Sequence, residues 1–109
     1  MTKIIAVTAC PSGVAHTYMA AEAIERAANA KGWECKVETQ GSIGLENELT
    51  AEDVAAADIV ILTKDIGIKF EERFKGKVTV RVGISDAVKR ADAIMEKIAV
   101  HLNNTAVTD

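Results

Sequence analysis

The chain has 109 residues, a formal net charge of −3 and 49% hydrophobic residues, but only 4% aromatic ones. This length predicts a single domain over residues 1–109, with an aliphatic core that buries roughly 65% of the unfolded surface. The negative charge argues against a nucleic-acid partner, which requires a clustered basic surface. No apolar run is long enough to insert into a membrane, and the N-terminus lacks a signal peptide, so we expect a cytoplasmic protein.

Four segments have the patterns of strands. Residues 4–7 and 59–62 are continuous apolar runs, which favour central strands covered on both faces. Residues 33–39 and 78–82 alternate between apolar and polar, which favours edge strands with one wet face. The order 2-1-3-4 places the apolar strands in the centre and joins them by short right-handed crossovers.

Helical patterns fill the intervals between these strands. Residues 17–31 carry an alanine-rich stripe that ends at Gly32, and Thr50 predicts an N-cap for a short helix through Ala57. A short helix is expected over 67–74, and a longer one over 85–103 with Ser85 as its cap. We interpret residues 41–48 as the longest loop.

These elements predict an α/β fold of three layers, αβα, around a four-stranded parallel sheet that is Rossmann-like or phosphatase-like. In such folds ligands bind beyond the carboxyl ends of the strands, where the winding direction switches. For the order 2-1-3-4 the switch lies between the first and third strands, directly beside residues 10–17.

Residues 10–17 (CPSGVAHT) join the first strand to the first helix and carry the strongest functional signal. Cys10 opens this loop, and a helix N-terminus lowers a thiol pKa and favours bound anions. We therefore predict that Cys10 is a reactive nucleophile rather than a buried apolar residue. The groups predicted to bind phosphate, through backbone N–H groups and hydroxyls, belong to Ser12, Gly13, Val14, Ala15, His16 and Thr17.

The spacing of the loop resembles C-x5-R-[ST] of low-molecular-weight tyrosine phosphatases, but His16 stands at the position of the arginine. Arginine holds phosphate through two hydrogen bonds and a permanent charge, whereas histidine is only partly charged at pH 7. The loop therefore predicts phosphate binding without efficient hydrolysis. His16 could equally be a structural residue of the helix start, and Thr17 a helix cap.

Other reactive side chains have simpler interpretations. Cys35 shares a face with Trp33 and Val37, which predicts a core residue, and His101 is expected on the surface of the last helix. Asp65 follows the third strand and could be an acid, a phosphorylation site or a turn residue; we favour the turn. The two cysteines and two histidines form no C-x-x-C or zinc pattern, so no metal and no cofactor are expected.

The motifs at 10–22 (CPSGVAHTYMAAE), 37–42 (VETQGS), 57–58 and 73–77 (RFKGK) resemble the IIB component of the fructose family of the bacterial phosphoenolpyruvate-dependent phosphotransferase system. The resemblance covers nearly the whole chain. It implies that a IIA phosphodonor protein passes a phosphoryl group from its phosphohistidine to Cys10. A IIC membrane permease then delivers this group to fructose or a fructose-like sugar during uptake, without membrane insertion of this chain.

Three other classes of protein share the predicted fold. A tyrosine phosphatase or arsenate reductase would need the missing arginine, and a flavodoxin-like module would need aromatic residues to flank FMN. A regulatory domain would keep the fold without phosphorylation of Cys10. Measurements of phosphatase activity, flavin colour and Cys10 phosphorylation separate these alternatives.

Overall fold

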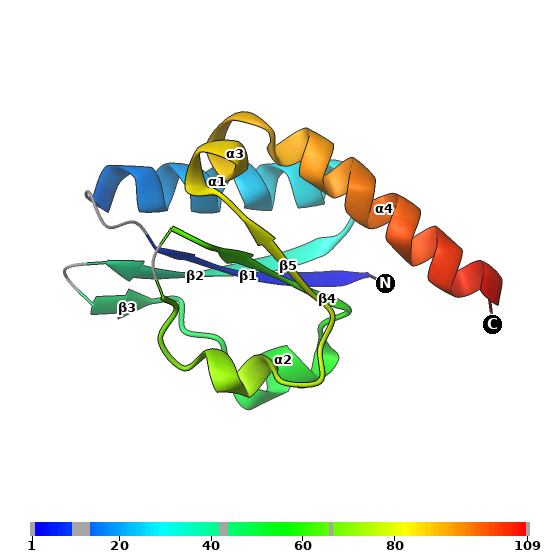
Figure 1. Cartoon of the computed structure of the whole chain (residues 1–109), viewed down its shortest axis with the longest axis horizontal. Coiled ribbons are helices and arrows are strands. Elements are labelled where there is room, and N and C mark those ends of the chain that lie inside the picture. The colour runs from blue at the N-terminus through cyan, green and yellow to red at the C-terminus, as the bar shows by residue number, and fades with distance from the viewer. Residues whose placement is uncertain (1, 10–13, 42–43, 66, 109) are drawn as a thin grey trace.

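The computed structural model describes residues 2–9, 14–41, 44–65 and 67–108, with the backbone alone for residues 14, 15, 41, 44 and 102–108. A twisted sheet in the order β3-β2-β1-β4-β5 forms the middle layer. Helices α1, α3 and α4 lie on one face of this sheet, and α2 with the short 3-10 helix η1 lies on the other (Figure 1). The predicted three-layer α/β architecture is therefore confirmed.

The strands are β1 (Lys3–Ala9), β2 (Glu34–Gly41), β3 (Gly44–Glu46), β4 (Ile59–Thr63) and β5 (Thr79–Val82). Strands β2, β1, β4 and β5 are parallel and have the predicted order. The prediction of four strands is wrong in one respect, because β3 pairs antiparallel with the end of β2 within the segment interpreted as a loop. A strand this short leaves almost no periodic signal in the sequence.

The helices are α1 (Val14–Ala30), α2 (Ala51–Ala56), η1 (Glu71–Phe74), α3 (Ile84–Lys89) and α4 (Ala91–Thr108). Helix α1 begins before the predicted residue 17, so Thr17 lies inside the helix and is not its cap. The Thr50 cap is confirmed as a capping box, in which the side chains of Thr50 and Asp53 each accept the other residue's backbone N–H. Only the end of the predicted helix at 67–74 forms, as η1.

The single helix predicted over 85–103 is in fact two helices that meet at Arg90. The N-cap of α3 is Gly83 rather than Ser85. Apolar spacing continues through the break, since Ala87, Ala91 and Ile94 are all buried. Helical periodicity therefore could not reveal the break.

The core has two parts, one on each face of the sheet. Alternate residues of β1 and β4 point to opposite sides, so Ile4 and Ile61 pack under α1 and α4, whereas Val7 and Leu62 pack over α2 and η1. All five residues of β4 are buried. The prediction that the two apolar runs are central strands covered on both faces is confirmed.

Candidate functional site

The carboxyl end of β1 marks the centre of the candidate site. Strand β1 pairs in parallel with β2 on one side and with β4 on the other. The chain leaves β1 through α1 on one face of the sheet and later reaches β4 through α2 on the opposite face (Figure 1). The winding direction therefore switches between β1 and β4, the position at which open α/β sheets bind their ligands.

Thr63, the last residue of β4, fixes the end of β1. Its buried hydroxyl accepts the N–H of Ala9 at 3.0 Å and donates to the carbonyl of Ala9 at 3.2 Å. Ladder pairing between these strands extends to Val7 and Leu62, so the side chain of Thr63 replaces the next backbone pair. The residue immediately before Cys10 is thus held in place by two hydrogen bonds.

The first turn of α1 is tied to the same strand. The buried hydroxyl of Thr8 donates to the carbonyl of Thr17 at 3.1 Å. The first turn contains no acidic residue, and the first N–H groups of a helix have no partner within it. The hydroxyl oxygen of Thr17 is also buried and has no hydrogen-bond partner among the described residues. These groups give the site donors and a positive helix end, which suit a bound anion.

The predicted site residues fall into three groups. Cys10, Ser12 and Gly13 lie outside the described residues. Val14 and Ala15 lie in the first turn of α1 rather than in the predicted loop. His16 is exposed on this turn, whereas Thr17 is 1% exposed.

Cys35 and Asp65 have structural surroundings. Cys35 packs against the core beneath α1, and burial raises the pKa of its thiol to about 12. It is therefore a poor nucleophile, which agrees with its interpretation as a core residue. The carboxylate of Asp65 accepts the N–H of Ile84 at 2.7 Å and so stabilises the start of α3 from the turn after β4.

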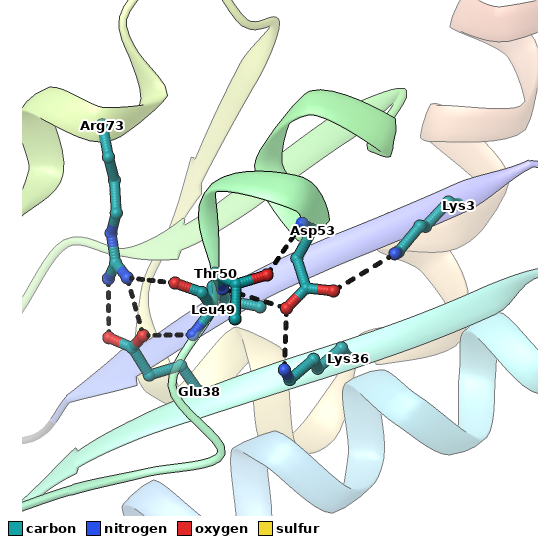
Figure 2. A network of polar contacts seen from close by, with 7 residues as sticks. All are labelled: Lys3, Lys36, Glu38, Leu49, Thr50, Asp53 and Arg73. Atoms are coloured by element: carbon teal, nitrogen blue, oxygen red, sulfur yellow. Dashed lines mark hydrogen bonds and ion pairs between the residues drawn. The ribbon is translucent and has the colours of Figure 1, made fainter.

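Sequence reasoning missed a buried polar network on the strand beside β1, centred on Glu38 of β2. Its carboxylate receives two hydrogen bonds from Arg73 of η1, at 2.8 and 2.6 Å, and one from the N–H of Leu49 at 2.8 Å (Figure 2). Burial alone would raise the pKa of Glu38, but bonds from Arg73, Gln40 and Leu49 outweigh burial and keep that pKa below its usual range.

Gln40 extends this network to the turn that precedes η1. Its side-chain amide donates to Glu38 at 2.7 Å and to the carbonyl of Lys69 at 3.0 Å, and its amide oxygen accepts the N–H of Lys69 at 2.8 Å. Gln40 is also the parallel partner of Ala9 in the sheet. The network therefore joins the segment after β4 to β2, the strand beside β1.

The prediction that β2 has a wet face is wrong at its carboxyl end. Val37, Glu38, Thr39 and Gln40 are all buried, because β3 and the segment leading to η1 cover this end of the strand. The sequence held one usable signal: Arg73 stands next to Phe74 in a short amphipathic stretch, and a charged residue on a buried surface requires an acidic partner.

Two further properties follow from the described part of the chain. No group of three or more histidine, cysteine or acidic residues there is arranged to hold a metal ion. Among the same residues, no helix has the length and apolar character needed to cross a bilayer.

A doubly wound sheet with a helix start at its switch point defines a class of α/β proteins that bind anionic groups at this edge. The chain matches the family described as PTS system, Lactose/Cellobiose specific IIB subunit, over residues 5–97. It is 86% identical over 106 residues to the PTS system fructose-like EIIB component 2 of Escherichia coli K12, covering 97% of this chain and all of that protein.

Longer relatives and solved structures indicate the same family. The chain is 50% identical over 95 residues to the PTS system fructose-specific EIIB'BC component of Haemophilus influenzae, covering 87% of this chain and 17% of that protein. The solution structure of an Enzyme IIB subunit from Escherichia coli K12 matches with a TM-score of 0.91 and 41% identity, over 96% of this chain and 97% of that one. The chain therefore belongs to the IIB family of the phosphotransferase system, as its motifs indicated, and is a phosphotransferase component of that system.

Proposed function

We propose that Cys10 is the phosphoryl carrier of this component. The observation that supports the proposal best is the position of Ala9: two hydrogen bonds with the Thr63 hydroxyl, one accepted and one donated by it, fix the residue before Cys10 at the switch point of the sheet. The start of α1 follows four residues later and has no acidic residue in its first turn. A thiolate or a phosphoryl group at this place is stabilised by the helix end.

The reaction is proposed in two balanced steps. The Cys10 thiolate attacks the phosphorus of a phosphohistidine on the IIA protein, so an S–P bond forms as the N–P bond breaks. A sugar hydroxyl bound by the IIC permease then attacks the same phosphorus. The S–P bond breaks, the thiolate is regenerated and the hydroxyl proton is released. We expect residues 1–109 to act as one cytoplasmic IIB domain between these two partners.

The loop groups have proposed roles in the phosphorylated state. Backbone N–H groups of Ser12, Gly13, Val14, Ala15 and His16 bind the phosphoryl oxygens, as do the Ser12 and Thr17 hydroxyls. The unpartnered, buried Thr17 oxygen supports this role for its hydroxyl. His16 stands where phosphatases carry arginine, so attack by water gains little stabilisation and the phosphocysteine persists until transfer.

The sugar is proposed to be fructose or a fructose-like sugar. This assignment rests on the names of the relatives, since the Escherichia coli and Haemophilus influenzae proteins are described as fructose-like and fructose-specific. Uptake of labelled fructose by cells that lack this chain and by cells that regain it provides the test.

Intact mass spectrometry tests the carrier. After incubation with phosphoenolpyruvate and the upstream proteins of the relay, the wild-type chain should gain the mass of one phosphoryl group. Cys10→Ser should gain none, whereas Cys35→Ser, the matched control at the half-buried thiol, should gain it as wild type does. Phosphorylation of Cys10→Ser at the wild-type level would refute the assignment.

A further inference from the structure

A groove of about 430 Å³ lies between the edge strand β5 and helix α4. Among the strands that the structure describes, β5 pairs with β4 alone, which separates it from β1. Helix α4 packs mainly against α1 and α3, so it leaves the neighbouring face of β5 partly open. The groove therefore lies across β4 from β1, and of its lining residues Lys64 directly follows Thr63 of the proposed phosphoryl site.

The floor of the groove is apolar. Val80 and Val82 lie on one face of β5, because successive strand residues alternate, and Val78 directly precedes the strand. All three line the groove together with Ile94 and Ile98 of α4. Val78 is 48% exposed and is one of few large apolar side chains that the described surface leaves so open. An apolar floor that the fold itself does not cover is typical of a site that binds another molecule.

The rim of the groove is cationic. It is formed by Lys64, Arg81, Arg90 and Lys97, with Asp86 as its acidic member. Arg81 is paired with Glu71, but no ion pair among the described residues includes Lys64, Arg90 or Lys97. This excess of positive charge occurs in a chain whose net charge is −3, so it is a local feature of this surface.

From this combination we infer that the groove binds a short acidic, amphipathic segment of a partner protein. Apolar side chains of the segment contact Val78, Val80 and Ile98, and its carboxylates face Arg90 and Lys97. An apolar centre with a charged rim is the usual composition of a protein interface, and complementary charge selects the partner. A two-fold contact between copies of this chain would instead bring the cationic rims together.

Photocrosslinking in cells of the source organism tests the inference. A benzoylphenylalanine at position 78 should crosslink to a partner, and mass spectrometry of the joined peptides should identify a segment with acidic and apolar residues. The control places the same residue at position 52, where Glu52 is exposed on α2 of the opposite face (Figure 1). No adduct with this segment should form from position 52.

Charge reversal provides the decisive comparison. Arg90→Glu combined with Lys97→Glu should reduce the position-78 adduct about tenfold, because two charge pairs are replaced by repulsions. Glu52→Lys should leave the adduct unchanged, and matching thermal unfolding curves should show that all the variants fold. The inference fails if the adduct joins two copies of this chain, contains nucleic acid, is absent, or survives the charge reversal. Phosphorylation of Cys10 should be retained in the double variant, so the carrier assignment is tested separately.

Discussion

Two carboxylates reach the α2 side of the sheet, and their surroundings differ sharply (Figure 2). Glu38 projects from β2 and is fully buried against the guanidinium of Arg73. Asp53 projects from α2, retains 18% exposure, and pairs with Lys36 at 2.7 Å and Lys3 at 3.4 Å. The first carboxylate is enclosed by the protein, and the second remains in contact with water.

The hydrogen-bond partners of Glu38 and Asp53 differ in the same way as their burial. Glu38 needs every bond it receives, because a buried charge without partners is strongly destabilising. Asp53 also accepts the N–H of Thr50 at 3.0 Å, so its partners include the capping box as well as two lysines. Arginine binds a carboxylate through two parallel bonds, whereas lysine acts as a mobile point charge. The comparison teaches that the Glu38–Arg73 pair requires one relative orientation of its two side chains. Asp53 can pair with its lysines in several orientations.

Arg73→Met should have the largest effect on stability. The substitution keeps the volume of the side chain but leaves Glu38 buried without its main partner, which costs about 3–5 kcal/mol of unfolding free energy. Urea denaturation measures this loss. Arg73→Lys, which keeps the charge but not the two parallel bonds, should lose less than Arg73→Met. A loss for Arg73→Met no greater than that of Lys36→Met would contradict the contrast between the two networks.

Removing both partners should be milder than removing one. The double variant Glu38→Leu/Arg73→Met is expected to be about 2 kcal/mol more stable than Arg73→Met alone, because no buried charge remains. It should stay below wild type, since the N–H of Leu49 loses its acceptor. A double variant as unstable as Arg73→Met would show that packing of the arginine stem, rather than the buried charge, determines the loss.

This contrast also marks how far the sequence could predict the fold. The apolar runs of β1 and β4, the stripe of α1 and the Thr50 cap all depend on neighbours in the sequence, so periodicity revealed them. Glu38 and Gln40 have the alternating pattern of an exposed face. Their burial depends on Arg73 and Lys69, which lie far along the chain, and no local pattern encodes that contact.

The candidate site divides in the same way. The switch point was predicted, because strand order follows from which runs are continuous and which alternate. The bonds that Thr63 makes to Ala9 could not be predicted, because they join the ends of two strands that are neighbours only in the folded sheet. The helix break at Arg90 was missed because the apolar spacing of α3 continues into α4.

Lowering the pH should remove the contribution of both carboxylates to the free energy of unfolding. Hydrogen bonds from Lys36 and Thr50 hold the pKa of Asp53 below its usual range, and the pKa of Glu38 is also lowered. Both groups bind protons less tightly in the folded state, so their stabilisation is complete above their ordinary pKa values and is lost as pH falls through the folded ones. Unfolding free energies from about pH 6 to about pH 3 should therefore fall in wild type, and fall less steeply in Asp53→Asn. Equal slopes would show that the folded protein does not favour the charged Asp53.

Lys36→Met should have the smallest effect and the greatest sensitivity to salt. The side chain of Lys36 is 37% exposed, and its partner Asp53 keeps bonds from Thr50 and Lys3 after the substitution. Exposed pairs of this kind contribute about 0.2–1 kcal/mol and are screened within roughly 10 Å at 0.1 M salt. The difference in unfolding free energy between wild type and Lys36→Met should shrink as sodium chloride is raised, whereas the loss in Arg73→Met should persist. If salt removed both differences equally, Glu38 would have to be accessible to solvent ions, and the contrast between an enclosed and a hydrated carboxylate would be lost.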